Sequence, residues 1–189
     1  MSAIFETDRV RLTAFTDDDL PQFAAWLSDF ELQRLVNPGI SMLIDVDDLL
    51  NPEGWFQQSL KSDTSCSFAV RTQPDSVFIG SCALVNRDSI THTAEIGINI
   101  AHPDYRGKGY GREIMLLLMH YGFEQWHLNR IYLKVMSFNA RAMHLYENLG
   151  FQHEVREREI LFHNGQYFDA LHMGILKSEW EATHAHTTK

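Results

Sequence analysis

Short segments with alternating polar and apolar residues, or with runs of β-branched and aromatic residues, predict strands along the whole chain. The segments are residues 9–15, 67–71, 77–85, 93–100, 130–136, 152–162 and 167–176. Asn164 and Gly165 separate the last two segments, and an Asn-Gly pair between apolar runs is a strong signal for a hairpin. The pattern therefore predicts a sheet whose last two strands are antiparallel neighbours.

Apolar residues spaced three or four positions apart predict helices between these strands. Leu20, Phe23 and Leu27 show this spacing behind a run of residues suited to a helix start. The predicted helices cover residues 17–29, 47–61, 112–127 and 139–149. Residues 30–46 are expected to be irregular, because an Asn-Pro-Gly run at residues 37–39 favours turns.

Length and composition limit the class of protein. A chain of 189 residues fits one domain, which we place at residues 1–181, followed by a disordered polar tail at 182–189. Sixteen Lys and Arg against 25 Asp and Glu give a net charge of −9, which argues against a general nucleic-acid binder and is compatible with a cationic substrate. The chain shows no signal peptide and no apolar run of about 18 residues, so we expect a cytoplasmic protein without a membrane partner.

The glycine-rich run from Arg106 to Gly111 carries the strongest chemical signal. Three glycines in five positions, between a predicted strand and a predicted helix, let the backbone approach a ligand closely. Their N–H groups and those of the helix start form a cradle for an anion, and Arg106, Lys108 and Arg112 add positive charge. The run predicts a phosphate or pyrophosphate site, although a glycine-rich loop with solvated basic residues explains the spacing equally well.

Two familiar phosphate motifs do not match. No GxxxxGK[ST] run is present, and the glycines follow about four predicted strands instead of the first strand of a βαβ unit. The pattern instead resembles the GNAT (Gcn5-related) N-acetyltransferases, whose phosphate loop reads [Q/R]-x-x-G-x-[G/A]; here it is Arg106-x-x-Gly109-x-Gly111. Residues 139–151 are similar to the N-x-x-A-x-x-x-Y-x-x-x-G-F segment of the same family. The two ends of the chain resemble the RimJ/RimL-like branch.

This resemblance implies an α/β fold with a mixed, mostly antiparallel sheet of about seven strands, flanked by about four helices. The fourth and fifth strands, 93–100 and 130–136, would splay apart to hold acetyl-CoA. It further implies a bulge at Asn99. By the same resemblance, the pantetheine arm would lie along the backbone of Ile98, Asn99 and Ile100, with Asn139 beside it. The pyrophosphate would lie on the amides of Arg106, Gly107, Lys108, Gly109, Tyr110, Gly111 and Arg112.

Amine attack on a thioester needs a proton acceptor for the amine and an acid for the leaving thiolate. By resemblance, Tyr146 is the acid, although it also belongs to an apolar helical stripe typical of a core tyrosine. Glu95 is the candidate base or amine-orienting group, and an ion pair explains it equally well. Asn139 also suits a helix N-cap. No His, Cys or Asp cluster has metal-ligand spacing, so we expect no metal.

The resemblance thus implies an acetyl-CoA-dependent N-acetyltransferase acting on a primary amine of a small molecule or a protein N-terminus. Ala94-Glu95 and the run at 164–167 are similar to spermidine acetyltransferases, so polyamine acetylation is the alternative; Gly97, where those enzymes carry a longer side chain, departs from them. Acids in the region expected to bind the acceptor favour a cationic substrate, but helix ends explain them better. They are Glu31, Asp45, Asp47, Asp48 and Glu53. A non-catalytic acyl-CoA-binding module and a homodimer are further hypotheses.

Overall fold

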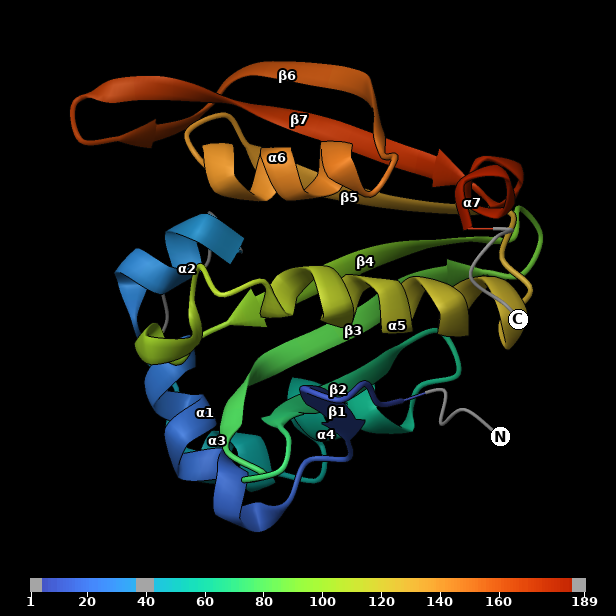
Figure 1. Ribbon diagram of the computed structural model, residues 1–189. Helices are drawn as coiled ribbons and strands as arrows, with labels where there is room; N and C mark the ends of the chain where they lie inside the picture. Colours follow the sequence, from blue (N-terminus) through green and yellow to red (C-terminus); the bar gives the residue numbers. More distant parts are fainter. Residues whose placement is uncertain (1–4, 37–42, 185–189) are drawn as a thin grey trace.

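The computed structural model describes residues 5–36 and 43–184. Within these ranges seven strands form one sheet in the order β1-β2-β3-β4-β5-β7-β6 (Figure 1). The strands are β1 (Val10–Thr13), β2 (Cys66–Thr72), β3 (Phe78–Asp88), β4 (Thr93–Ile100), β5 (Arg130–Met136), β6 (Gln152–His163) and β7 (Gln166–Leu176). All neighbours are antiparallel except β4 and β5, which are parallel. The predicted mixed, mostly antiparallel sheet is confirmed.

The helices fall into two groups around this sheet. In Figure 1, α1 to α4 gather at one end of the molecule, whereas α5 and α6 lie alongside β4 and β5. The helices are α1 (Leu20–Leu27), α2 (Phe30–Val36), α3 (Val46–Leu50), α4 (Trp55–Lys61), α5 (Tyr110–Glu124), α6 (Ala140–Asn148) and α7 (Lys177–His184), with 3₁₀ helices η1 (Asp17–Asp19) and η2 (Pro103–Tyr105). No helix in the described part of the chain is long and apolar enough to cross a membrane.

The sequence-based helices need three corrections. Residues 30–46 are not irregular throughout, because α2 begins at Phe30; Asp29 caps it by accepting from the amides of Glu31 and Leu32 at 3.0 and 3.1 Å. Residues 37–42 of that segment lie outside the described residues. The helix predicted at 47–61 is two helices, α3 and α4. A turn separates them, in which Gly54 N–H donates to the Asn51 carbonyl at 2.9 Å.

The third correction concerns the C-terminus. The disordered tail was expected to begin at residue 182, but α7 extends to His184. Trp180 of α7 packs in the main core with its ring centroid 5.9 Å from that of Phe123, which gives this helix an apolar anchor. The remainder of the expected tail, residues 185–189, lies outside the described residues.

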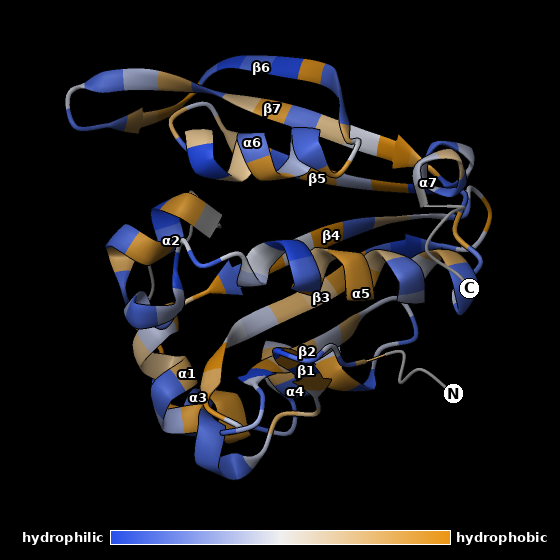
Figure 2. Ribbon diagram, viewed as in Figure 1, coloured by the Kyte–Doolittle hydropathy of each residue, from blue (hydrophilic) through white to orange (hydrophobic). Residues whose placement is uncertain are grey.

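Two buried clusters hold the fold together. The larger one packs α5 against the sheet and includes Ile96, Leu118 and Ile131; the smaller one lies among α1 to α4 and includes Phe23 and Phe56. Figure 2 shows hydrophobic residues on α5 and along β3, whereas the edge strand β6 is mostly hydrophilic. The alternation that predicted the strands therefore reflects burial on the α5 face of the sheet.

An ion pair connects η1 to the sheet. Arg71 of β2 donates through Nη2 to both carboxylate oxygens of Asp19, at 2.7 and 2.6 Å. Asp19 also accepts from the backbone N–H of Thr16 at 2.8 Å. The Asp19 side chain is 5% exposed, so these partners are needed to stabilise its buried negative charge.

The strands β4 and β5 part after a short paired stretch. Their register includes only Thr93↔Arg130, Ala94↔Ile131 and Glu95↔Tyr132. On its other edge β4 stays paired with β3 without interruption from Glu95 to Ile100, so the bulge expected at Asn99 is wrong. The gap arises because β5 diverges, and it leaves one backbone edge of β4 without a partner strand beyond Glu95.

Candidate active site

A cavity of about 410 Å³ occupies the gap between β4 and β5. Its walls come from β4, β5, α2, the glycine-rich loop, the first turn of α5 and most of the length of α6. A volume of several hundred Å³ is typical of a small-molecule site. The splay of the sheet therefore produces the pocket.

The glycine-rich loop adopts a backbone that glycine favours. Gly107 and Gly109 have φ angles of +74° and +87°, in the left-handed region where a side chain is strained. Gly109 is also the N-cap of α5. The backbone N–H groups of Arg106 and Arg112 donate to the carbonyls of Pro103 and Gly109 at 3.2 and 3.1 Å, so the expectation that these two amides hold an anion is wrong. Within the described part of the chain, the N–H groups from Gly107 to Gly111 have no acceptor, and they lie together at the loop and helix start, as an anion site requires.

Arg9 fixes this loop from outside the motif. Its Nη2 donates to the Lys108 carbonyl at 2.7 Å, its Nη1 lies 3.0 Å from Glu113 Oε1, and its guanidinium stacks on Tyr110 with 4.3 Å to the ring centroid. Thr7 donates to the other Glu113 oxygen at 2.6 Å. The N-terminal segment thus neutralises the one acidic residue in the first turn of α5.

Arg106 has a different role from the one its charge suggested. Its Nε donates to the Ile100 carbonyl at 3.0 Å, and its Nη2 donates to the Ala101 carbonyl. These bonds close the end of β4 and set the direction in which the loop leaves the strand. The backbone of Arg106 remains at the pocket, but part of its guanidinium is used by the protein itself.

Glu95 lies on the face of β4 that turns away from α5. Ala94, Ile96 and Ile98 pack in or against the core, so period-two alternation places Glu95, Gly97 and Asn99 on the opposite face. Asn86 Nδ2 donates to Glu95 Oε2 at 3.1 Å. A Cβ added at Gly97 would meet no described atom within 4 Å. Glu95 therefore borders an open notch above Gly97.

Tyr146 reaches the pocket from α6. Its ring packs against the core beside Phe151, with 6.0 Å between centroids. Burial raises the pKa of Tyr146 to about 12. The phenol therefore keeps its proton at neutral pH, as a general acid must.

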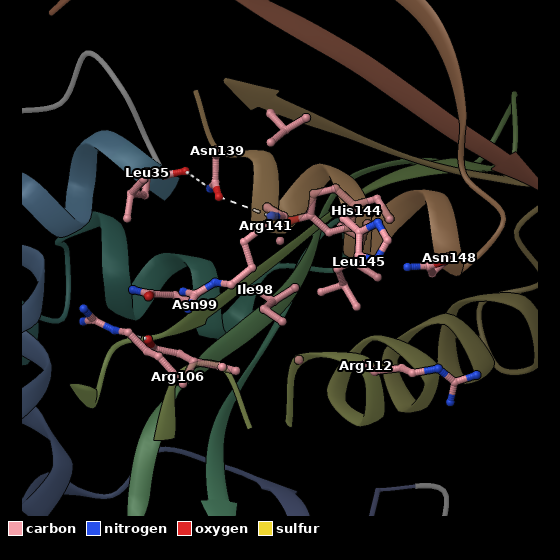
Figure 3. A pocket seen from close by; sticks show the side chains of 18 of the residues that line it. Leu35, Ile98, Asn99, Arg106, Arg112, Asn139, Arg141, His144, Leu145 and Asn148 are labelled. Carbon is pink, nitrogen blue, oxygen red and sulfur yellow. Dashed lines mark hydrogen bonds between the residues drawn. The ribbon is translucent and has the colours of Figure 1, made fainter. Parts of the chain in front are cut away.

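Asn139 is the N-cap of α6, since its Oδ1 accepts from Ala142 N–H at 3.2 Å. Its Nδ2 faces the Leu35 carbonyl of α2 at 3.5 Å (Figure 3). The N-cap explanation considered for this residue is therefore correct, and this side chain connects the two walls of the pocket.

The structure brings most of the predicted site residues together. The predicted residues that line the pocket are Glu95, Ile98, Asn99, Ile100, Arg106, Gly107, Gly109, Gly111, Arg112, Asn139 and Tyr146. Lys108 and Tyr110 are not among the lining residues: Lys108 lies over the Tyr105 ring, and Tyr110 lies beneath Arg9.

Sequence reasoning missed several residues of the pocket. Leu32 and Leu35 line it from α2, and the N-cap signal of Asp29 before an apolar-spaced run could have indicated that helix. Lys134 lines it from β5, paired with Glu157 at 2.5 Å. Arg141 lines it from α6 with no motif to mark it.

The acids of the region expected to bind the acceptor are largely used for structure. Asp45 and Asp48 form a capping box at the start of α3, and Glu31 is paired with Arg34. Glu95 is the one carboxylate among the pocket-lining residues that the structure describes. Over the same part of the chain, no group of three or more His, Cys, Asp or Glu side chains is placed to hold a metal ion.

Comparison with known proteins gives a consistent result. Residues 9–152 match the family model of the acetyltransferase (GNAT) domain. The chain is 39% identical over 102 residues to spermidine N(1)-acetyltransferase of Vibrio cholerae, covering 54% of this chain and 58% of that protein. It is 29% identical over 134 residues to the uncharacterized N-acetyltransferase YokL of Bacillus subtilis, covering 71% and 74%.

Solved structures agree over a greater length. The crystal structure of the Vibrio cholerae spermidine N-acetyltransferase in complex with CoA and spermine has a TM-score of 0.82 and 28% identity, covering 92% of this chain and 99% of that one. The sequence match to the Vibrio cholerae spermidine N(1)-acetyltransferase spans little more than half of that protein's length, whereas the fold is shared over almost the whole solved chain. With the family model covering more than half of the sequence, this chain belongs to the GNAT family of acetyltransferases.

Proposed function

We propose that this chain transfers the acetyl group of acetyl-CoA to a primary amine of a small aliphatic polyamine. Two supports are independent of each other. The cavity combines an anion cradle with a single carboxylate, Glu95, beside the open notch at Gly97. The similar spermidine N(1)-acetyltransferases are named for a substrate of this class.

The pocket suits acetyl-CoA by its chemistry. The edge of β4 that has no partner strand offers backbone N–H and C=O groups between Ile98 and Ile100 to the amides of a pantetheine arm, as a peptide adds to a sheet edge. The Ile100 carbonyl is not among them, because it accepts from Arg106 Nε at 3.0 Å. The amides from Gly107 to Gly111 offer the cradle for a pyrophosphate. Acetyl-CoA supplies an activated thioester carbonyl when it is bound.

Two side chains of this protein would then carry out the two proton transfers of the reaction. Glu95 would hold the incoming ammonium at the notch and take up its proton, directly or through water. Tyr146, protonated because burial raises its pKa to about 12, would donate to the departing thiolate from the other wall. The observation that carries this assignment is that both groups line one cavity from opposite sides of the splayed strands.

Other acceptors define the alternatives. A protein N-terminus fits the same chemistry, and the putative ribosomal N-acetyltransferase YdaF of Bacillus subtilis is 34% identical over 107 residues. Membership of the RimJ/RimL-like branch and a homodimer stay predictions. A non-catalytic acyl-CoA-binding module would retain the cradle but would not need Tyr146.

A thiol-release assay with acetyl-CoA tests the proposal. The acceptor panel contains spermidine, spermine, aminoglycosides, free amino acids and peptides with varied N-termini. We expect turnover with the polyamines. Turnover only with peptides would replace the polyamine assignment, and CoA binding without turnover on any acceptor would favour the non-catalytic module.

Gly97→Leu tests the acceptor notch separately from the cofactor site. The added side chain enters open space on a strand, so we expect the fold and the Kd for CoA to be retained, while kcat/KM for the amine falls at least tenfold. Ser81→Leu, on the neighbouring strand β3, is a control for adding a leucine to this sheet. An unchanged kcat/KM in Gly97→Leu would show that the amine does not bind at the notch.

A further inference from the structure

Arg141 is an arginine at the pocket that the described protein does not use. It belongs to the first turn of α6, its side chain is exposed, and it lines the cavity. Among the described residues it has no ion pair and no side-chain hydrogen bond, in contrast to Arg9, Arg71 and Arg106. An arginine that is directed into a pocket without a partner indicates an anionic ligand.

The position of its guanidinium identifies the part of the pocket that it serves. A Cβ built on Gly107 would lie 3.8 Å from Arg141 Nη1. The side chain therefore crosses from α6 to the glycine-rich loop, which belongs to the opposite wall. Figure 3 shows Arg141 leaving α6 and extending over the pocket toward β4.

The electrostatics around Arg141 point in the same direction. The N-terminal ends of α5 and α6 both face this cavity, and each first turn contains a cation, Arg112 and Arg141. Helix dipoles disfavour cations at these ends, so an anion placed between them would relieve both helices. Arg106 cannot replace Arg141 fully, because two of its donor groups are bonded to the carbonyls of Ile100 and Ala101.

We infer that Arg141 binds the pyrophosphate of the cofactor from the wall opposite the glycine-rich loop, so that the pyrophosphate is held between α6 and the amides of Gly107 to Gly111. This inference rests on the proposed use of acetyl-CoA. Helix α6 then has a binding role in addition to carrying Tyr146. A pyrophosphate bound in this way would connect the two walls of the pocket, where β4 and β5 lie apart.

Isothermal titration with CoA and dephospho-CoA tests the assignment, together with kcat/KM for acetyl-pantetheine, which has no phosphate. We expect Arg141→Gln to raise the Kd for CoA and for dephospho-CoA by about 10- to 100-fold. The same variant should leave kcat/KM for acetyl-pantetheine unchanged. Arg141→Lys should recover part of the affinity, because it restores the charge without the guanidinium fork.

Arg158→Gln, an exposed arginine on β6, is the matched control and should bind CoA as the wild type does. An unchanged Kd for CoA in Arg141→Gln would overturn the inference. A loss with CoA but not with dephospho-CoA would move the contact to the 3′-phosphate and overturn the pyrophosphate assignment. An equal loss in kcat/KM for acetyl-pantetheine would mean that Arg141 has a structural role and would also overturn the inference. Failure of the wild type to bind CoA would instead refute the proposed function.

Discussion

Gly109→Glu places a side chain and a negative charge at the centre of the anion cradle. Gly109 has a φ of +87° and is the N-cap of α5. Its Cβ would lie 3.7 Å from Arg9 Nη1, an ordinary contact distance, so the protein has space for the first atom. The change therefore tests charge and backbone conformation without a collision in the core.

The expected loss of affinity follows from two contributions. A residue with a Cβ in the left-handed region costs about 1–2 kcal/mol, which lowers the stability of the loop. A carboxylate about 4 Å from one charge of the pyrophosphate adds about 4 kcal/mol of repulsion at the effective dielectric of a protein surface. The repulsion alone corresponds to a loss of roughly 10³-fold in CoA affinity.

Calorimetric titration with CoA measures the affinity, and urea denaturation measures the stability. Gly165→Glu is a matched control, because Gly165 has a φ of +82° and a Cβ there would meet no described atom within 4 Å. We expect both variants to lose about 1–2 kcal/mol of stability, and only Gly109→Glu to lose CoA binding. If Gly109→Glu bound CoA within tenfold of the wild type, the phosphate-loop assignment would be refuted.

Three further outcomes are expected. Tyr146→Phe should lower kcat by about 10²-fold or more while the Kd for CoA stays within twofold, as measured by thiol release and calorimetry; an unchanged kcat would remove Tyr146 as the acid. Because burial raises the pKa of Tyr146 to about 12, its acid form persists throughout the accessible pH range. A primary aliphatic amine loses its proton near pH 10, so kcat/KM should keep rising up to pH about 10 without an alkaline decline; a decline that disappears in Tyr146→Phe would contradict this. Asp19→Ala leaves Arg71 unpaired, so urea denaturation should show a loss of about 3–5 kcal/mol, and a loss below 1 kcal/mol would mean that water solvates Arg71.

The central strands could be predicted from the sequence because burial on one face produces their alternation. Residues 93–100 and 130–136 were predicted with the bounds that β4 and β5 have. The glycine run indicated the loop, since its left-handed residues are visible as glycines. The local sequence pattern was sufficient to predict an element wherever the element's conformation and burial are both visible in its own residues.

The sequence was insufficient where distant residues meet. Arg9 reaches the Lys108 carbonyl across 99 positions, and no local pattern marks such a contact. Arg141 resembles any exposed helical arginine until the glycine-rich loop is placed opposite it. The break at residues 51–54 was missed because the apolar spacing continues across it.

The early end of the β4–β5 ladder also links cofactor binding to the stability of the whole domain. Only the pairs from Thr93 to Glu95 join the two parts of the sheet at this seam, so a ligand lying along the open edges would supply the cross-connections that the polypeptide lacks. A ligand that binds only the native state raises the free energy of unfolding by RT ln(1 + [L]/Kd), about 2.7 kcal/mol at a hundred times the Kd. The melting temperature of this protein should therefore follow the CoA concentration of its surroundings, and amides at residues 96–100 should exchange with deuterium more slowly as that concentration rises.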